Sequence, residues 1–485
     1  MTDSIRIGAV TYRDRNLPER RVRVVEGSEN NANHMTAITG RNGVGKSRLL
    51  SHVAAVFDAV SGGKPRPGID ATVEYEVGPF RCTATLRGGR ILASLNGLPV
   101  ESSRLPAPKR VAAVTTSAFD KFHIPHSASK GSPSLSPSTY RYLGLKDSRG
   151  RISATAGLYR ALDELFDSIA SDEHHRSRVS EVFEDLGYEA RVEVLYDWTR
   201  LGGGLVKSGA DLGQEEYRAF SIQTSEISDS WIGREIPQAK EPLIRELANA
   251  VQLIGQLGTS REGALTADFR NPTVARLDHL RAAQLLRRAD MIRTKSVNLI
   301  RVGSGERVNV KDASSGELSL VTAMLGIASA IDDNSLILID EPEINLHPGW
   351  QSSYIERLLA AFERFEGCHF LIATHSPLVV SGLGEFNSNV VSLEQGIDAE
   401  HTAGRSVDEV LVRAFGMAGP DNLFVKQTLV RALRMASDGK YNGPEFSALE
   451  NLLRASAMAN GLAPAVRRVI EDLESTVALA RRAPK

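Results

Sequence analysis

The chain has 485 residues, of which 42% are hydrophobic and 24% charged, with 58 Lys and Arg against 59 Asp and Glu. This length supplies two or three domains with a large core, and the net charge of −1 excludes a whole-chain field that would attract nucleic acid or an anionic membrane. The two cysteines, Cys82 and Cys368, are far apart without metal-ligand spacing, which indicates a reducing compartment. The N-terminus has no apolar signal-peptide core, and the longest apolar run, residues 318–331, is too short to span a bilayer. We therefore expect a cytoplasmic protein without a membrane partner.

The sequence of residues 1–117 predicts a series of strands and one glycine-rich turn. Alternating apolar residues predict strands, and residues 109–117 form a more continuous apolar run typical of an interior strand. The other strands expected here are 5–10, 21–25, 72–77, 80–86 and 90–95. Gly-containing turns separate the last three, which favours antiparallel pairing.

The central motif lies within Met35–Leu50, where an apolar strand is followed by GRNGVGKS and the start of a helix that runs to about Val60. Glycines let successive N–H groups point into one concavity that suits phosphate oxygens, and the helix N-terminus adds its positive dipole end. Lys46 can reach the β- and γ-phosphates, and the Ser47 hydroxyl can bind Mg²⁺. A glycine-rich turn with a surface lysine is the plain alternative, but the strand before and the helix after favour nucleotide binding. The expected ATP-binding residues of this loop are Gly40, Asn42, Gly43, Val44, Gly45, Lys46 and Ser47.

The middle of the chain predicts an insertion. Residues 118–150 are rich in Ser, Pro and Gly and read as a loop, and helical patterns begin at 153, interrupted by a strand at 191–198. The arginines of a helix at 273–288 could meet phosphates, but a solvated face is favoured because no aromatic residues are interleaved. A hairpin is expected from 296–303 and 307–312.

A second set of polar residues follows buried strands near the end of the chain. Four apolar residues precede Asp340 and Glu341, which predicts a strand buried on both faces with its acids at the carboxyl end, where open α/β sheets place ligands. We expect Asp340 to bind Mg²⁺ and Glu341 to act as the general base that orients water. Residues 369–380 read as a second buried strand followed by a polar turn, and His375 lies after the strand. From Ser406 onward the chain reads as helices, the first of which begins with a Ser406–Glu409 capping box.

In order, GRNGVGKS, SSGE, LILIDEPEINLHP and ATHSP resemble the motifs of ABC-type P-loop ATPase heads of the AAA family, and the SMC/RecF/OLD-like branch in particular. The resemblance implies that Ser314, Ser315, Gly316 and Glu317 form the signature segment, which caps the ATP held by another subunit. It implies that His375 contacts the γ-phosphate, so that Glu341, His375 and Lys46 form the catalytic set and Ser47 and Asp340 bind the metal. Two chains would then pair around two ATP molecules as an isologous dimer.

Two features depart from this resemblance. ABC heads carry a Gln after the strand expected at 109–117, whereas here the sequence is TTSAFDKF, in which Ser117 or Asp120 could make that contact. The residue that stacks on adenine is not assigned, and Tyr12 is either that residue or part of the core.

The fold class expected is α/β, an ABC-type ATPase head with a mixed sheet and an antiparallel β lobe, interrupted by a mainly helical insertion and followed by C-terminal helices. The domain boundaries expected are 1–117 and 296–395 for the two lobes of the head, 118–295 for the insertion and 396–485 for the helical region.

Four sequence segments that are less specific than these motifs resemble the stand-alone ATPases of Septu-type and retron-associated anti-phage systems. They are DEPEINLHPGWQ, GCHFLIATHSP, YRYLGLKD and VDEVLVRAFG. This resemblance implies a hydrolysing ATPase that dimerises on ATP, or forms a higher assembly, and regulates a separate effector of the HNH nuclease type. One alternative is a RecF-like repair ATPase that clamps duplex DNA, which leaves a nucleic-acid partner open. Another is a scaffold that holds ATP without hydrolysing it, against which Glu341 and His375 argue.

Overall fold

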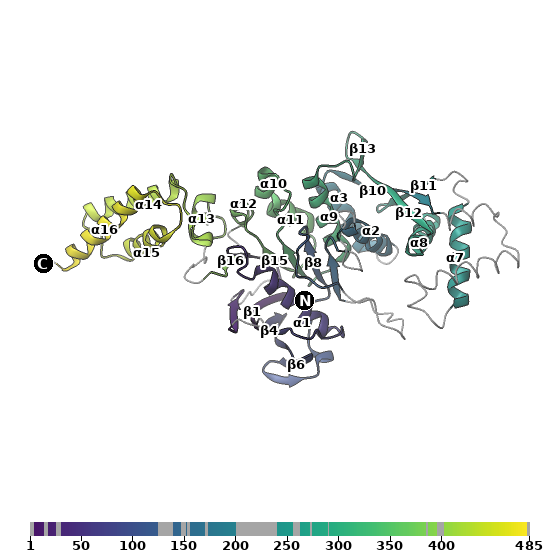
Figure 1. Cartoon of the computed structure of the whole chain (residues 1–485), viewed down its shortest axis with the longest axis horizontal. Coiled ribbons are helices and arrows are strands. Elements are labelled where there is room, and N and C mark those ends of the chain that lie inside the picture. Colours follow the sequence, from purple (N-terminus) through teal and green to yellow (C-terminus); the bar gives the residue numbers. More distant parts are fainter. Residues whose placement is uncertain are drawn as a thin grey trace.

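The computed structural model describes residues 4–13, 18–25, 31–124, 139–146, 152, 156–169, 173–199, 240–255, 262–271, 274–289, 291–384, 387–394 and 402–482. The molecule is elongated: two sheets lie at its centre, a third sheet with helices lies at one end, and the C-terminal helices lie at the other (Figure 1). The part of the chain before the inserted region and the part after it both lie at the centre, where together they form the head.

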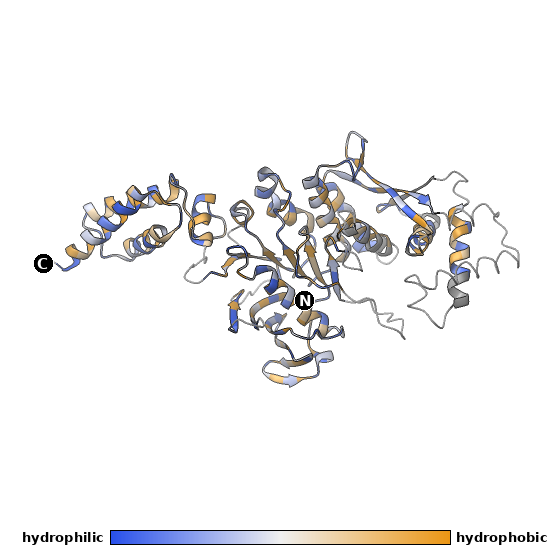
Figure 2. Ribbon diagram, in the orientation of Figure 1, coloured by the Kyte–Doolittle hydropathy of each residue, from blue (hydrophilic) through white to orange (hydrophobic). Residues whose placement is uncertain are grey.

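The central sheet has six parallel strands in the order β16-β3-β15-β14-β8-β9. Successive side chains of a strand point into two different cores. In β14, Leu336 and Leu338 pack with α1 on one face, whereas Ile337 and Ile339 pack with α9 and α11 on the other. This double burial explains the uninterrupted apolar run before Asp340, and Figure 2 shows the central strands largely as hydrophobic. The elements are β3 (His34–Thr39), β8 (Val111–Thr115), β9 (Tyr140–Leu143), β14 (Leu336–Asp340), β15 (His369–Ala373), β16 (Ser388–Ser392), α1 (Lys46–Val60), α9 (Ser315–Ala330), α10 (Pro348–Ser352), α11 (Tyr354–Phe362) and α12 (Pro377–Ser381).

An antiparallel sheet in the order β2-β1-β4-β5-β6-β7 covers the other side of α1. In β4 every second residue is buried, as the alternation in the sequence predicts. The structure therefore contains the parallel and antiparallel strands and the antiparallel lobe expected of the head, and the parallel strands form a sheet of their own. The elements are β1 (Ile5–Arg13), β2 (Arg20–Arg23), β4 (Asp70–Val77), β5 (Phe80–Arg87), β6 (Arg90–Leu95), β7 (Leu98–Val100) and the short helix η1 (Ser102–Arg104).

The inserted region carries a third sheet, in the order β11-β10-β12-β13, together with helices. Its apolar core continues into the head, because Val321 and Leu325 of α9 belong to the same buried cluster. The elements are α2 (Ala156–Ile169), α3 (Glu173–Asp185), α7 (Lys240–Gly255), α8 (Val274–Arg288), β10 (Tyr188–Trp198), β11 (Glu262–Asp268), β12 (Ile292–Arg301) and β13 (Arg307–Asn309). Of the arginines expected on the helix at 273–288, Arg281 is exposed and Arg287 half-buried, and the side chains of Arg276 and Arg288 lie outside the described residues.

Two expectations for this region need correction. The hairpin assigned to the head within 296–395 is β12 and β13, and β12 pairs with β10 of the insertion, so on strand pairing the inserted sheet extends past residue 295. Residues 118–150, expected as a loop, contain the edge strand β9, whose Tyr140, Tyr142 and Leu143 are buried against the head. Most of the Ser/Pro stretch, 125–138, lies outside the described residues.

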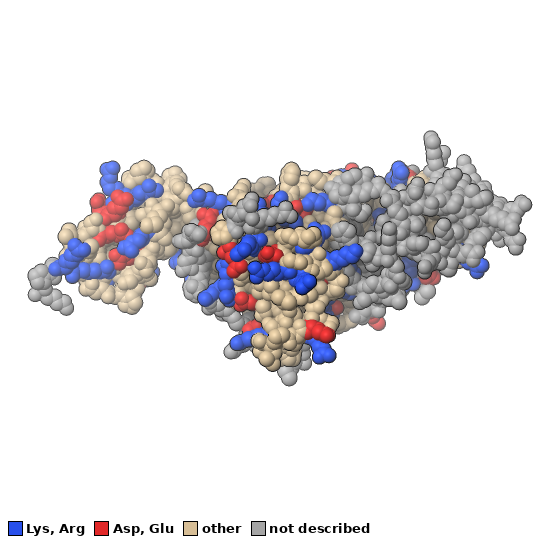
Figure 3. Space-filling view, turned by 60° about the horizontal axis from the view of Figure 1, so that its bottom comes forward, with Lys and Arg blue, Asp and Glu red and all other residues tan. Residues whose placement is uncertain are grey.

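The C-terminal region is helical, as expected, and has its own apolar cluster. The first half of the expected capping box is present, since the Ser406 hydroxyl accepts from the N–H of Glu409 at 3.4 Å. Acidic and basic side chains are interspersed on the face seen in Figure 3. The helices are α13 (Val407–Phe415), α14 (Leu423–Ser437), α15 (Pro444–Met458) and α16 (Pro464–Arg482). Across the described parts of the chain, no helix combines the length and apolar character needed to cross a membrane.

Candidate functional site

The glycine-rich loop joins the end of β3 to the start of α1, as the sequence predicts. Gly45 immediately precedes α1 with a φ of 111°, and a Cβ at Gly40 would approach Val44 Cγ1 to 2.8 Å, so both positions favour glycine. The loop is held from outside: the backbone N–H of Arg41 donates to Glu394 Oε1 at 2.6 Å, and Arg20 donates to the carbonyl of Val44 at 3.2 Å. Contacts from outside the loop thus hold its main chain at Arg41 and at Val44.

The side chain of Lys46, the first residue of α1, lies against the loop and reaches His375, which follows the neighbouring strand β15. Its Nζ donates to the carbonyl of Gly40 at 2.7 Å and lies 2.7 Å from Nε2 of His375. The residue is 4% exposed, and burial lowers the pKa of Lys46 to about 8, opposed by nearby carboxylates of which Glu341 is the strongest. A cation that has lost most of its hydration gains strongly from a phosphate, which would replace these weak neutral partners.

Ser47 and Asp340 form the second contact between the loop and a strand end. The Ser47 hydroxyl donates to Asp340 Oδ1 at 2.9 Å. Asp340 is 1% exposed, and burial raises the pKa of its carboxyl to about 7, with the hydrogen bond from Ser47 acting in the opposite direction.

This pair fits Mg²⁺, because a hydroxyl and a buried carboxylate are hard oxygen donors and a cation would restore the charge that burial disfavours. Within the described residues, no group of three or more His, Cys, Asp and Glu is placed to hold a metal ion. Ser47 and Asp340 supply two oxygen ligands, and Mg²⁺ sites for nucleotides commonly take the others from phosphates and water.

Glu341 and His375 face each other beside this pair. His375 Nε2 lies 3.4 Å from Glu341 Oε1, and burial lowers the pKa of His375, assisted by the charge of Lys46. Glu341 has a φ of 52°, an uncommon conformation for a non-glycine residue that turns the chain directly after β14. A neutral imidazole between Lys46 and Glu341 joins the lysine and the expected base in one connected group.

Glu343 is a site residue that the sequence analysis did not assign. Its Oε2 accepts from the Thr374 hydroxyl at 2.8 Å, and its Oε1 accepts from the backbone N–H of His375 at 2.5 Å. Burial raises the pKa of Glu343, and these hydrogen bonds oppose the shift. Glu343 therefore fixes the turn that carries His375. The signal for it was the third acid in Asp340-Glu341-Pro342-Glu343, which a solvated turn would explain equally well.

The signature segment, Ser314–Glu317, forms the N-cap and the first turn of α9. The Ser314 hydroxyl caps the helix by accepting from the N–H of Glu317 at 3.2 Å. A Cβ at Gly316 would lie 2.7 Å from the carbonyl oxygen of Asn345, so the helix start touches the turn that follows Glu341. Among the described residues, no hydrogen bond or ion pair joins this segment to residues 40–47.

The residues left open by the sequence have structural partners. Asp120 is buried, and its Oδ2 accepts from the Tyr142 hydroxyl at 3.0 Å and from Lys146 at 3.0 Å. The Ser117 hydroxyl accepts from the N–H of Phe119 at 3.2 Å. Tyr12 is 5% exposed with its ring 5.1 Å from that of His52, which fits the core reading better than an exposed stacking surface.

The chain is similar to known proteins over parts of its length. Residues 209–381 match the family described as "AAA domain, putative AbiEii toxin, Type IV TA system". Over these residues the chain is therefore similar to AAA-domain proteins. The match includes the signature segment, Asp340, Glu341 and His375, whereas the glycine-rich loop lies before it.

This P-loop ATPase-like chain also resembles two retron proteins. It is 27% identical over 100 residues to the "Retron Vc95 probable ATPase" of Vibrio cholerae serotype O1 biovar El Tor, covering 18% of this chain and 19% of that protein. It is 31% identical over 83 residues to the "Retron Ec83 probable ATPase" of Escherichia coli, covering 15% of each chain. The matched segments thus span less than a fifth of these relatives.

Among solved structures, the SMC head domain from Thermotoga maritima aligns over 79% of this chain and 94% of its own, at 13% identity and a TM-score of 0.29.

Proposed function

We propose that this chain binds ATP with Mg²⁺ at the carboxyl edge of its central sheet and hydrolyses it to ADP and phosphate. One observation carries the proposal: the ends of three strands bring Lys46, Ser47, Asp340, Glu341 and His375 into one set, joined by the contacts of Lys46 and Glu341 with His375 and of Ser47 with Asp340. Phosphoryl transfer needs such a set because its catalysis is mostly positioning and charge stabilisation.

Each residue has a role that follows from its position. Lys46 would exchange its contacts with Gly40 and His375 for the β- and γ-phosphates, and His375 would then meet the γ-phosphate. Ser47 and Asp340 would hold Mg²⁺, which when bound neutralises phosphate charge. Water attacks the γ-phosphorus, its proton passes to Glu341, and the bond from that phosphorus to the β-phosphate oxygen breaks.

The ATPase is proposed to act as a dimer. The signature segment presents a helix N-terminus, a natural anion site, yet it lies against Asn345 instead of the loop of its own chain. Two chains could each supply this helix end to the nucleotide of the other, which gives a closed two-fold contact.

We further infer that the dimer regulates a separate effector in anti-phage defence, with a nuclease of the HNH type as the expected partner. The similarity to two proteins named as retron ATPases supports the defence context. The C-terminal helices offer a surface for such a partner, because Leu423, Val430 and Leu433 of α14 are all exposed. The cytoplasm is the compartment that this role implies.

The test of the chemistry is steady-state ATP hydrolysis by the full chain with Mg²⁺. We expect Glu341→Gln to lower turnover at least about 100-fold while leaving ATP binding within a few-fold of wild type. Glu356→Gln, an exposed change on α11, serves as the matched control. Turnover that is the same in Glu341→Gln as in wild type would remove Glu341 from its role, and wild-type protein without hydrolysis would overturn the ATPase proposal.

A further inference from the structure

The carboxylate of Glu317 joins the signature segment to the inserted sheet. Its Oε1 accepts from the Tyr188 hydroxyl at 2.7 Å and from the Arg301 guanidinium at 3.2 Å. Glu317 lies in the first turn of α9, directly beside Gly316 and Ser315. Two donors from outside the head therefore fix the first turn of the helix that is expected to meet ATP.

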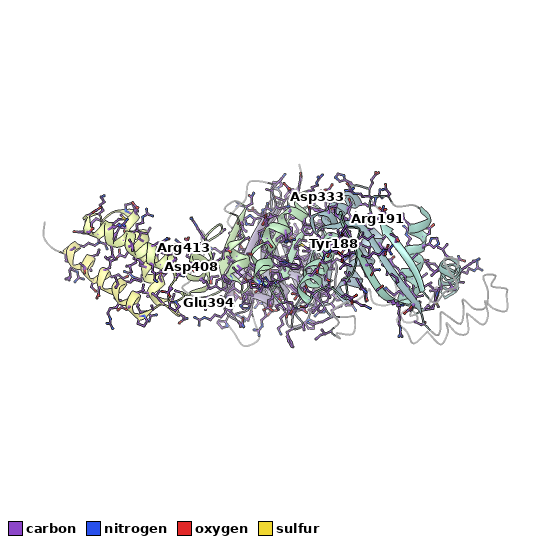
Figure 4. The ribbon with its side chains drawn as sticks, turned by 90° about the horizontal axis from the view of Figure 1, so that it is seen from above. Tyr188, Arg191, Asp333, Glu394, Asp408 and Arg413 are labelled. Carbon is purple, nitrogen blue, oxygen red and sulfur yellow. The ribbon has the colours of Figure 1, made fainter. Side chains whose placement is uncertain are left out.

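Both donors come from neighbouring strands of one sheet. Tyr188 opens β10 and Arg301 closes β12, and the two residues are register partners in the ladder. The guanidinium carbon of Arg301 also lies 5.7 Å from the centre of the Tyr188 ring. Figure 4 shows Tyr188 where the inserted region meets the head. Any rotation of the inserted sheet would thus move both donors together.

The two contacts differ in strength. Tyr188 is 3% exposed, and burial together with its bond to Glu317 raises its pKa to about 12, so the hydroxyl remains a donor at neutral pH. The Arg301 side chain is 45% exposed, so solvent and salt screen its ion pair with Glu317. We expect the neutral, buried hydrogen bond from Tyr188 to matter more.

The other side of this helix start is also fixed. Gly316 touches the carbonyl of Asn345, and that residue lies in the turn leading back to Glu341. Helix α2 of the insertion packs along α9 as well. The first turn of α9 is therefore held between the inserted sheet on one side and the turn beside the catalytic acids on the other.

We propose that Tyr188 and Arg301 are positioning residues for the signature segment: through Glu317 they set how the start of α9 meets the nucleotide of a second chain. The inserted sheet thereby controls ATP-dependent pairing of the heads. This inference rests on the proposed function, since it requires the ATP-bridged dimer.

The experiment measures three quantities on the full chain: binding of ATP to the monomer, the protein concentration at half-maximal dimer in a Glu341→Gln background, and hydrolysis at low and high protein concentration. For Tyr188→Phe, we expect unchanged monomer binding and a half-maximal concentration raised about tenfold. Hydrolysis per chain should fall at low protein concentration and recover at high concentration. A purely structural role would not produce this recovery.

Matched variants separate the alternatives. Tyr196→Phe makes the same change on the same buried strand and should leave dimerisation at the wild-type value. Arg301→Lys keeps the charge and should retain more dimer than Arg301→Met. If wild type dimerises on ATP and Tyr188→Phe matches it within about twofold, the positioning role is overturned alone. If wild type itself stays monomeric with ATP, the dimer of the proposed function fails, and the positioning role fails with it.

Discussion

Gly316→Ala tests whether the signature segment and the turn after Glu341 act as one unit. A Cβ at this position would lie 2.7 Å from the carbonyl oxygen of Asn345, whereas ordinary contacts begin at 3.4 Å. The gap must therefore open by about 0.7 Å. The alanine Cβ is attached rigidly to the backbone of α9 and the Asn345 oxygen is itself backbone, so neither atom can rotate away.

The energetic result follows from two opposed effects. Alanine is a better helix former than glycine by up to about 1 kcal/mol, but less so in the first turn. Overpacking of fixed backbone costs about 1–3 kcal/mol, so the clash should prevail, with a net loss of roughly 1–2 kcal/mol. Because the strain falls on the helix start and on the turn beside the acids, we expect ATP-dependent dimerisation and turnover to fall about tenfold or more, with ATP binding by the monomer retained.

The assays are chemical unfolding without nucleotide, ATP titration of the monomer, and hydrolysis. Gly419→Ala is the matched control, because a Cβ there meets nothing within 4 Å. If Gly316→Ala equals Gly419→Ala in stability, dimerisation and turnover, the contact with Asn345 does not constrain the site and the reasoning is refuted.

Three further predictions concern buried ionisable residues. Lys46→Met should weaken ATP binding about 100-fold or more in a calorimetric titration while leaving the melting temperature of the nucleotide-free protein unchanged or higher, since it removes a buried cation; ATP binding near the wild-type affinity would contradict it. Glu343→Gln should lower turnover about 10- to 100-fold with little change in ATP affinity, because His375 loses its charged anchor; turnover equal to that of Glu356→Gln would contradict this role. Burial lowers the pKa of His34 from 6.5 to about 4. Between these two pH values His34 is protonated in the unfolded chain but not in the folded one, so the free energy of unfolding falls as the pH drops from 6.5 toward 4. Between pH 7.5 and 5, His34→Gln should lose about 2 kcal/mol less unfolding free energy than wild type in urea titrations, and equal losses would contradict the assignment.

The parts of the site that could be predicted are those whose cause is local in sequence. The loop from Gly40 to Ser47 can be recognised in the sequence because its glycines, its lysine and its serine hydroxyl all lie within eight residues. Asp340 and Glu341 come at the end of a strand that is buried on both faces. Polar residues at that position lie at the carboxyl edge of the sheet, where open α/β sheets bind ligands. The expected positions of these residues in the fold match the structure, whereas their chemical roles await the experiments above.

What could not be predicted depends on contacts between distant segments. Glu343 meets Thr374 only when β14 and β15 pair, and Tyr188 meets Glu317 across 129 residues of chain. The expected boundary at residue 295 falls within β12, because the alternation of a strand does not specify that β10 is its partner. Strand β9 was missed because four residues beside a Ser/Pro-rich stretch carry too weak a pattern.

The most direct test of the ATP-bridged dimer is the mass of the full chain in solution by light scattering, for wild type and Glu341→Gln, with and without ATP and Mg²⁺. The proposed function predicts a mass that doubles only with ATP and stays doubled in Glu341→Gln, because that variant binds ATP but does not hydrolyse it. A mass that is already high without nucleotide and does not change with ATP would contradict it, and would show that other surfaces assemble the particle.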